Sequence, residues 1–214
     1  MKALWGSAVL GVLASWRLAS QSLAIGPQFL LADYRETFSN LHFTGSGFGA
    51  AATLSYKKAA AEVAYASLTY DPADDGDAVT GFKATQFDAR LRYYVAGPAS
   101  LEVGVTSRTV DPEFAAQSAG AARVGVRLSQ LVDPAVRLIL RGNYLPAAKF
   151  SGGGSAAFGL ELSLGVSGDF ARGRIRLAAD YEFQYFNRET DDGSGAVSVP
   201  LQQALLRFGV AGTF

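Results

Sequence analysis

Apolar and polar residues alternate along most of this chain, from about Phe29 to Phe214. The alternation is clearest at 174–185, where odd positions are mostly apolar or aromatic and even positions are mostly charged or polar. Because successive side chains of a β-strand point to opposite faces, the pattern predicts long strands with one apolar and one polar face. Two folds satisfy it: a soluble sandwich that buries the apolar face, and a membrane barrel that turns the apolar face outward.

The pattern divides into ten predicted strands separated by turns and loops. They span about 28–38, 46–57, 60–71, 82–95, 99–110, 120–131, 135–147, 156–168, 173–187 and 200–214. Many of them have about 11–15 residues, whereas strands of soluble proteins usually have about five or six. A tilted strand needs about 9–11 residues to cross a bilayer, so the predicted lengths favour the membrane barrel.

The predicted connections alternate between short and long. Short turns fall at 57–59, 96–98, 132–134 and 169–172, and the other connections are longer and rich in Gly, Asp, Ser or Pro. Short turns at one end and long loops at the other are typical of bacterial outer-membrane barrels. An even number of strands also places both termini at the short-turn end, which would face the periplasm.

Three features favour an outward apolar face. Aromatic residues tend to lie at the ends of this face, as expected for girdles at the two bilayer interfaces. The chain has 14 Arg and 5 Lys, and Arg occupies strand centres, where a planar guanidinium can meet carboxylates in a confined lumen. The polar face also contains many Gly, Ala and Ser, which leave room inside a narrow barrel. We therefore expect an all-β fold, a closed antiparallel up-and-down transmembrane barrel of ten strands, with eight or twelve possible.

The first 24 residues differ from the rest of the chain. Lys2 precedes an apolar stretch from Ala3 to Trp16, and Ser22 and Ala24 provide the small residues that precede a cleavage site. This predicts a signal peptide at 1–24 and a barrel at 25–214, with a buried N-terminal helix as the alternative.

Composition excludes several classes of function. The formal charge is zero and no basic block occurs, which argues against a nucleic-acid partner. The absence of Cys excludes disulfides and thiol catalysis. No apolar run reaches the roughly 18 residues that a membrane-spanning helix needs.

The C-terminus resembles the terminal signal strand of Gram-negative outer-membrane proteins. Arg207, Gly209 and Phe214 match its pattern of a polar residue, a glycine two positions later and a final Phe, whereas Gly212 stands where a hydrophobic residue is usual. With the leader and the ten strands, the resemblance to small outer-membrane β-barrel proteins covers nearly the whole mature chain. It implies export to the periplasm, insertion by the barrel-assembly machinery and residence in the outer membrane, in contact with lipid and lipopolysaccharide.

Residues for catalysis or metal binding are scarce. The single histidine, His42, falls in the predicted first outer loop, where we interpret it as an ordinary loop residue. An omptin-like protease would need an Asp–His pair and a second Asp pair, and no Asp-x-His occurs. The acidic segment Asp71–Asp77 lacks EF-hand ligands, because Ala73 and Phe82 stand at ligand positions. We expect no enzymatic activity, no cofactor and no metal.

Charged residues predicted to face the lumen form the main candidate site. They are Arg90, Arg92, Arg123, Arg127, Arg137, Arg141, Asp88, Glu102, Glu161, Asp180 and Glu182. The turn positions predict Arg127 opposite Arg137, Arg123 opposite Arg141, and Glu161 opposite Asp180. Because crowded like charges are costly at low dielectric, we expect Arg–carboxylate pairing across strands. Either this network is a structural plug, or surplus arginines form an anion-favouring constriction.

Near the outer end, the apolar face turns polar on neighbouring strands. The residues are Ser67, Thr69, Lys83 and Thr85, with Ser107 and Thr109 beside them. This predicts contact with lipopolysaccharide head groups, or docking of a protein partner or a second copy. The sequence as a whole predicts a non-enzymatic structural or interaction role. A narrow passive channel and, more distantly, a secreted soluble β-sandwich are the alternatives.

Overall fold

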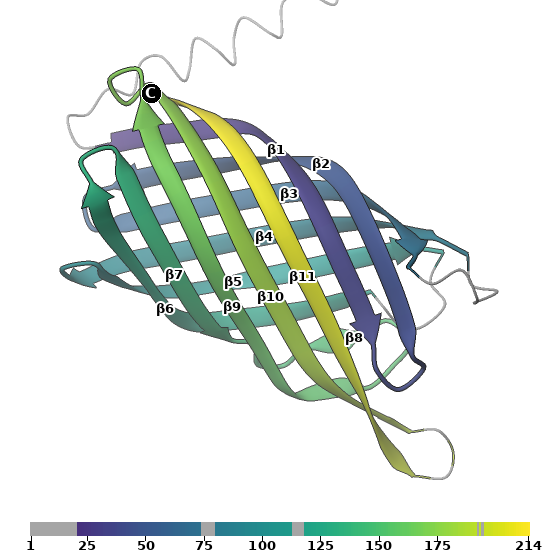
Figure 1. The fold of residues 1–214 in the computed structure, drawn as a ribbon. Coiled ribbons are helices and arrows are strands. Elements are labelled where there is room, and N and C mark those ends of the chain that lie inside the picture. The colour runs from purple at the N-terminus through teal and green to yellow at the C-terminus, as the bar shows by residue number, and fades with distance from the viewer. Residues whose placement is uncertain (1–20, 74–79, 113–117, 192, 194) are drawn as a thin grey trace, which may run out of the picture.

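The computed structural model describes residues 21–214 except 74–79, 113–117, 192 and 194, and these residues form a closed β-barrel (Figure 1). Each long strand pairs antiparallel with the next, and β1 closes the ring by pairing with β11. The ten long strands are β1 (Gln21–Glu36), β2 (Leu41–Tyr56), β3 (Ala59–Pro72), β4 (Phe82–Ala96), β5 (Ala99–Asp111), β6 (Ala119–Asp133), β7 (Val136–Tyr144), β9 (Ser155–Phe170), β10 (Ile175–Asp191) and β11 (Ala196–Thr213). A two-residue strand, β8 (Lys149–Phe150), pairs with β6 and β9. The predicted fold class is confirmed.

The short turns and both ends of the barrel wall lie at one end of the molecule. Leu23 and Phe214 exchange two backbone hydrogen bonds, with N–O distances of 3.0 and 2.8 Å. The turns after β2, β4, β6 and β9 connect the strands at this same end (Figure 1). We call it the inner end and the opposite end the outer end. Gln21 and Phe214, the two ends of the described barrel wall, therefore lie beside the short turns.

Several strands are longer than the alternation predicts. Residues 21–24, which the sequence assigns to the signal peptide, pair with β2 in the wall, while residues 1–20 lie outside the described part of the chain. Residues 37–40 alone separate β1 from β2, so His42 lies in β2, and its predicted place in a loop is wrong. β10 runs to Asp191, through part of a segment predicted as loop. The strands continue because the ladder joins backbone groups, which does not require alternating side chains.

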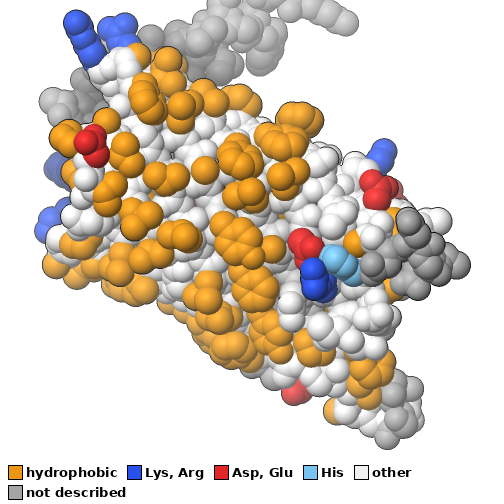
Figure 2. Space-filling model, in the orientation of Figure 1, with side chains coloured by type: hydrophobic (Ala, Val, Ile, Leu, Met, Phe, Trp, Pro, Cys, Tyr) orange, Lys and Arg blue, Asp and Glu red, His pale blue; other side chains and the backbone are white. Residues whose placement is uncertain are grey.

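Large apolar side chains cover the outward face of the wall near the inner end and at mid-height (Figure 2). Leu91 on β4 is 60% exposed and Leu164 on β9 is 51% exposed. A continuous apolar surface of this extent is unfavourable in water. In lipid it is favourable, and a closed barrel leaves no strand edge with unpaired backbone groups. This part of the wall is therefore the lipid-facing belt.

At the outer end, the two faces of several strands, β4 among them, exchange character. On β4 the outward residues change from Phe87 to Thr85 and Lys83, while the inward residues change from Asp88 to Phe82. The polar outward residues at this end were predicted from the sequence, whereas the apolar inward residues were not. We call this part of the barrel the outer extension; it comprises 32–46, 66–72, 82–85, 107–111, 145–150 and the described residues of 186–202.

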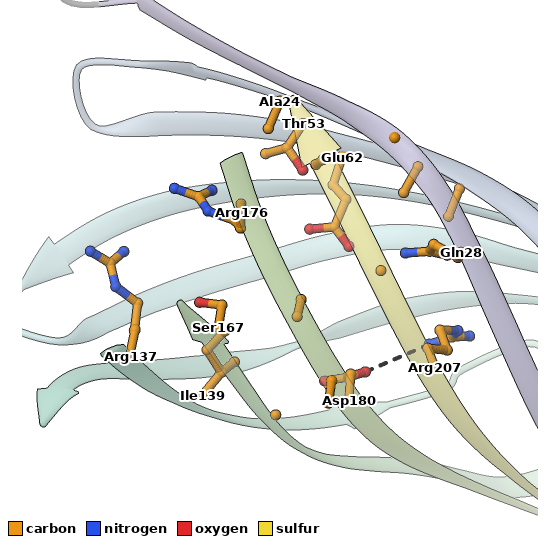
Figure 3. Close-up of a pocket in the computed structure, with 18 of the residues that line it drawn as sticks. Ala24, Gln28, Thr53, Glu62, Arg137, Ile139, Ser167, Arg176, Asp180 and Arg207 are labelled. Carbon is orange, nitrogen blue, oxygen red and sulfur yellow. Dashed lines mark ion pairs between the residues drawn. The ribbon is translucent and has the colours of Figure 1, made fainter. Parts of the chain in front are cut away.

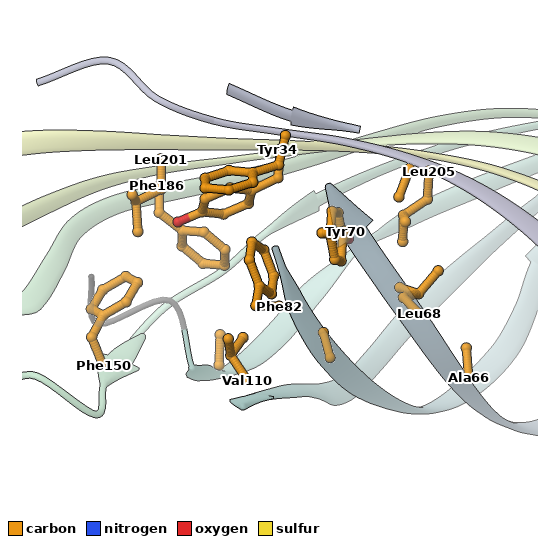
Figure 4. Packing of buried hydrophobic residues seen from close by; sticks show 14 of the residues in the cluster. Tyr34, Ala66, Leu68, Tyr70, Phe82, Val110, Phe150, Phe186, Leu201 and Leu205 are labelled. Carbon is orange, nitrogen blue, oxygen red and sulfur yellow. The ribbon is translucent and has the colours of Figure 1, made fainter. Parts of the chain in front are cut away.

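An aromatic core fills the outer extension (Figure 4). The rings of Tyr70 and Phe82 stack with centroids 4.6 Å apart, and Phe43 meets Phe82 edge-on at 5.0 Å. Phe150 from β8 packs edge-on against Phe186 of β10 at 5.8 Å. Such packing is typical of a soluble protein interior. The outer extension thus has a polar outside and an apolar inside, which suits an aqueous surrounding.

Candidate functional site in the barrel lumen

The register of β6 and β7 differs from the prediction. Arg127 lies opposite Arg141, and Arg137 lies opposite Leu131, because the chain turns between Asp133 and Val136, later than the predicted pairings require. The predicted pairings of Arg127 with Arg137 and of Arg123 with Arg141 are therefore wrong. Sequence alternation fixes which face a residue occupies, but a displacement of the turn changes its partner.

The register of β9 and β10 also differs. Glu161 lies opposite Gln184, and Asp180 lies opposite Gly165, so the predicted Glu161–Asp180 pair is wrong. The turn at 171–174 contains three consecutive residues with positive φ, and strand pairing resumes only at Phe170 and Ile175. A Cβ at position 165 would lie 2.6 Å from Asp180 Oδ1, so a larger residue there would displace the Asp180 side chain.

Glu182 is the centre of a buried ion-pair network. Arg207 Nη1 and Nη2 donate to its two carboxylate oxygens at 2.8 and 3.0 Å, which is a bidentate pair. Arg90 Nη2 donates to Glu182 Oε2 at 2.7 Å and Arg90 Nη1 donates to Glu62 Oε1 at 3.2 Å. Gln184 donates to Glu182 Oε1 at 3.1 Å. Side chains from β3, β4, β10 and β11 therefore meet across the lumen.

A second group of contacts joins the opposite wall. Arg123 Nη2 donates to Asp88 Oδ1 at 2.6 Å and lies 3.3 Å from Glu161 Oε2. Asn143 Nδ2 donates to Glu161 Oε1 at 2.9 Å and to Glu102 Oε1 at 3.2 Å. The side chains of Arg123 and Glu161 have no exposed surface. Because unpaired buried charges are very costly, the matched arginines and carboxylates hold the lumen in one arrangement.

The lumen is filled on the outer side of this network. Gln203 Nε2 donates to Tyr70 Oη at 3.0 Å, Arg108 donates to Gln203, and the Arg108 guanidinium lies 4.8 Å from the centre of the Tyr34 ring. A cavity of about 10 Å³ beside Arg108 has room for about one water molecule. The aromatic core begins directly beyond. The residues that line this small cavity all differ from those that line the larger cavity on the inner side of the network.

On the inner side, the network is the floor of a cavity of about 300 Å³ (Figure 3). Arginines that line it are Arg90, Arg92, Arg127, Arg137, Arg141, Arg176 and Arg207, and carboxylates that line it are Glu62 and Asp180. Ser22, Ser55 and Tyr94, close to the inner end of their strands, also line it. The cavity therefore extends from the ion-pair network to the inner end of the barrel.

Sequence reasoning missed several charged residues of the lumen, among them Glu62 and Arg176. Glu62 on β3 lies 3.2 Å from Arg90, 3.3 Å from Arg92 and 3.9 Å from Arg127. Arg176 on β10 pairs with Asp169 at 2.7 Å near the inner end. Alternation alone could have found Glu62, because it has the inward parity of its strand.

The predicted partner face lies on the outward wall of the outer extension. Ser67, Thr69, Lys83 and Thr85 are all exposed and occupy β3 and β4, with Ser67 opposite Thr85 and Thr69 opposite Lys83. Ser107 and Thr109 continue this face on β5. The residues predicted to form one surface are therefore adjacent in space.

The single histidine contributes to the same outer wall. His42 Nε2 lies 2.8 Å from Asp33 Oδ2, and Arg35 Nε donates to Asp33 Oδ1 at 3.0 Å. The cluster is visible at the outer end in Figure 2. Asp33 lies in the outer extension, above the lipid belt. Burial raises the pKa of its carboxyl, but the hydrogen bonds from His42 and Arg35 lower the pKa by more, so that it lies below its ordinary value. The sequence missed this pair because Asp33 and His42 lie on neighbouring strands.

The three residues of the C-terminal resemblance occupy different positions on β11. Arg207 faces inward and binds Glu182, Gly209 lines the inner cavity, and Phe214 is 80% exposed at the inner end. Their service as an assembly signal stays a prediction.

The described residues contain neither a cluster of metal-binding side chains nor a membrane-spanning helix. No group of three or more His, Cys, Asp or Glu side chains there could hold a metal ion. The same part of the chain contains no helix that is long and apolar enough to cross a membrane.

Known proteins resemble this chain in structure and not in sequence. No protein-family model matches the sequence, and no curated protein matches it. The outer membrane protease OmpT from Escherichia coli is similar over 94% of this chain and 98% of its own, with a TM-score of 0.53 and 9% identity. The beta domain of the Bordetella autotransporter BrkA is similar over 87% and 98%, with a TM-score of 0.51 and 14% identity. This likeness shows the fold of an outer-membrane β-barrel, and the lipid-facing belt agrees with that fold.

Proposed function

We propose that this outer-membrane barrel is non-conducting and non-enzymatic, and that it has a structural or interaction role at the cell surface. The observation that carries this proposal is the filled lumen. An ion-pair network spans the middle of the barrel and an aromatic core fills the outer extension. Solute passage would require both layers to open, which leaves the outer extension as the surface available for function.

The outward wall of β3–β5 is the proposed contact surface. On β5 the outward apolar residues are Leu101, Val103 and Val105 before Ser107, whereas on β9 outward apolar residues extend from Phe158 to Phe170. The polar wall therefore begins lower on the β3–β5 side. Its hydroxyl groups and Lys83 are suited to lipopolysaccharide head groups, or to the polar rim of a protein partner.

A narrow anion-favouring channel is the second candidate, because the inner cavity is rich in arginine. Planar-bilayer recording of the refolded full barrel distinguishes the two. We expect no conductance above that of bilayers with detergent alone. Reproducible, anion-selective single-channel steps would contradict the closed barrel and support the channel.

Crosslinking tests the proposed contact surface. The chain has no Cys, so Ser67→Cys and Thr85→Cys provide single labelling sites on the polar wall. In cells, a photo-crosslinker there is expected to capture lipopolysaccharide or a discrete protein. Phe87→Cys, in the lipid belt of the same strand, is the control. Equal capture of phospholipid alone at all three sites would refute a specialised surface.

The Asp33 carboxylate and the His42 imidazole have the chemistry of an acid–base pair. Their place on the outward wall nevertheless supports a non-enzymatic assignment. Neither residue lines the inner cavity, and Arg35 occupies the remaining side of the Asp33 carboxylate. Purified barrel with lipopolysaccharide is expected to leave a library of basic and acidic peptides intact. Peptide cleavage that His42→Ala abolishes would overturn this assignment.

A further inference from the structure

The inner cavity has an excess of positive charge. Arg90 and Arg207 at its floor are paired with Glu182, and Arg176 at its rim is paired with Asp169. The remaining arginines of the lining, Arg92, Arg127, Arg137 and Arg141, face only two lining carboxylates, Glu62 and Asp180. Seven arginines and two carboxylates therefore line the cavity, while Glu182, Asp169, Asp88, Glu102 and Glu161 contact Arg90, Arg207 or Arg176 from outside the lining.

The surplus arginines also have spare hydrogen-bond donors. Arg127 approaches Glu62 no closer than 3.9 Å, and its Nε is buried without an acceptor among the described residues. Arg141 uses Nη2 for Asp180, while its Nε and Nη1 are buried without an acceptor there. No ion pair with Arg137 occurs in the described part of the chain. The charges of these guanidinium groups therefore have few partners among the described residues, and an anion in the cavity would be attracted to them.

The cavity is accessible from the periplasm and closed toward the outside. Arg137 and Arg176 near the inner end are partly exposed, whereas Arg90 and Arg207 at the floor are buried. Figure 3 shows Arg137, Arg176 and Ser167 at one end of the cavity and Arg207 at the other. A ligand therefore enters and leaves through the same mouth.

We propose that this cavity is a binding site for a small phosphate-bearing anion that enters from the periplasm. Planar guanidinium groups bind phosphate oxygens through two parallel hydrogen bonds. Arg127, Arg137 and Arg141 supply the charge, and Ser167 supplies a hydroxyl group at the mouth. The volume of about 300 Å³ is at the lower end of the range of small-molecule pockets, so a compact ligand fits.

Calorimetric titration of the refolded full barrel with pyrophosphate and with inorganic phosphate tests the proposal. We expect saturable binding that weakens with ionic strength, and tighter binding of pyrophosphate because it carries more charge. Arg127→Gln and Arg137→Gln are each expected to weaken binding about tenfold or more, since each removes a charge-assisted contact. Arg174→Gln is the control, because Arg174 is exposed in the inner-end turn outside the cavity lining.

A labelling measurement locates the bound anion. Ser167→Cys places a thiol at the mouth, and pyrophosphate is expected to slow its modification by a thiol reagent while leaving Ser151→Cys in the outer turn unaffected. Folding of each variant is verified by heat-modifiable migration on gels. Failure of the wild-type barrel to bind either probe would overturn the proposal. Equal weakening by Arg174→Gln, or no protection of Ser167→Cys, would assign binding to the charged surface and would also overturn it.

Discussion

The inner part of the barrel and its outer extension are built from the same strands with opposite polarity. On β4, Arg90 and Asp88 point into an ionic lumen while Leu91 and Phe87 face lipid. A few residues further, Phe82 points inward and Lys83 outward. Both parts belong to the one continuous strand β4, so the reversal of polarity lies in the side chains and follows the change in surroundings. One part is solvated by hydrocarbon and the other by water.

This comparison makes the outer extension a small soluble-type core at the end of a membrane barrel. Its stability should depend on apolar packing, whereas that of the inner part should depend on matched charges and a lipid-compatible wall. Substitutions chosen as pairs, one in each environment, separate these dependences.

The largest expected effect is loss of packing in the outer extension. Phe82→Ala removes a ring that contacts Tyr70 and Phe43 in the aromatic core, and we expect a loss of about 3–5 kcal/mol in the free energy of unfolding. Phe87→Ala on the same strand is the control, because lipid can occupy the vacated space and the loss should be clearly smaller. Urea unfolding in lipid vesicles, followed by gel migration, measures both. Equal losses would contradict the distinction between a packed core and a lipid-facing wall.

Removal of one charge from the lumen is expected to have the next largest effect. Glu182→Gln leaves Arg90 and Arg207 without their shared carboxylate, and breaking such a buried network costs about 3 kcal/mol. The remaining carboxylates Asp88 and Glu161 limit the loss. Glu189→Gln, exposed on β10 in the outer extension, should be nearly neutral. A neutral Glu182→Gln variant in the same unfolding measurement would show that the network does not stabilise the barrel.

An added charge on the outward wall should destabilise the barrel in the lipid belt and have little effect in the outer extension. Leu91→Arg places a guanidinium in the lipid belt, where arginine costs about 2 kcal/mol or more near the bilayer centre. Thr85→Arg places it on the polar wall, where the change should be about 0.5 kcal/mol or less. The yield of heat-modifiable barrel and its unfolding midpoint measure both variants. Similar destabilisation by the two variants would place Thr85 in lipid as well.

The smallest expected effect concerns the pH dependence of the outer wall. Because the folded pKa of Asp33 is depressed, the pair with His42 and Arg35 stabilises the fold above the unfolded pKa and loses this contribution as pH falls through the folded pKa. Asp33 is partly exposed, so screening keeps the effect at about 0.5 kcal/mol or less. An NMR titration should show the Asp33 pKa rising toward its ordinary value in His42→Gln. An unchanged pKa would show that His42 does not stabilise the carboxylate.

Much of the fold could be predicted because it depends on a period-two pattern. The ten strands, the short turns and the adjacent termini follow from alternation and from where it is interrupted. Strand ends could not be predicted, because the backbone ladder continues through residues such as His42 and Glu189 that break the pattern.

The lumen site could be predicted by face but not by partner. Arg123, Glu161 and Glu182 have the parity of inward residues, and the structure places all three inside. Their contacts depend on the positions of the turns before Val136 and before Ile175, which set the register and leave little trace in the pattern. Arg207 binding Glu182 requires β11 beside β10, and Arg123 binding Glu161 requires contact across the lumen.

The sequence by itself determined that the strands have two chemically different faces, because alternation and strand geometry have the same period. Only the tertiary structure decided which face is inside at each level of the barrel. Closure of the ring places Phe82, Tyr70 and Phe43 together at one level and Glu182, Arg90 and Arg207 at another. Inside and outside are properties of the closed ring and its two solvents, and neither is present in a single strand.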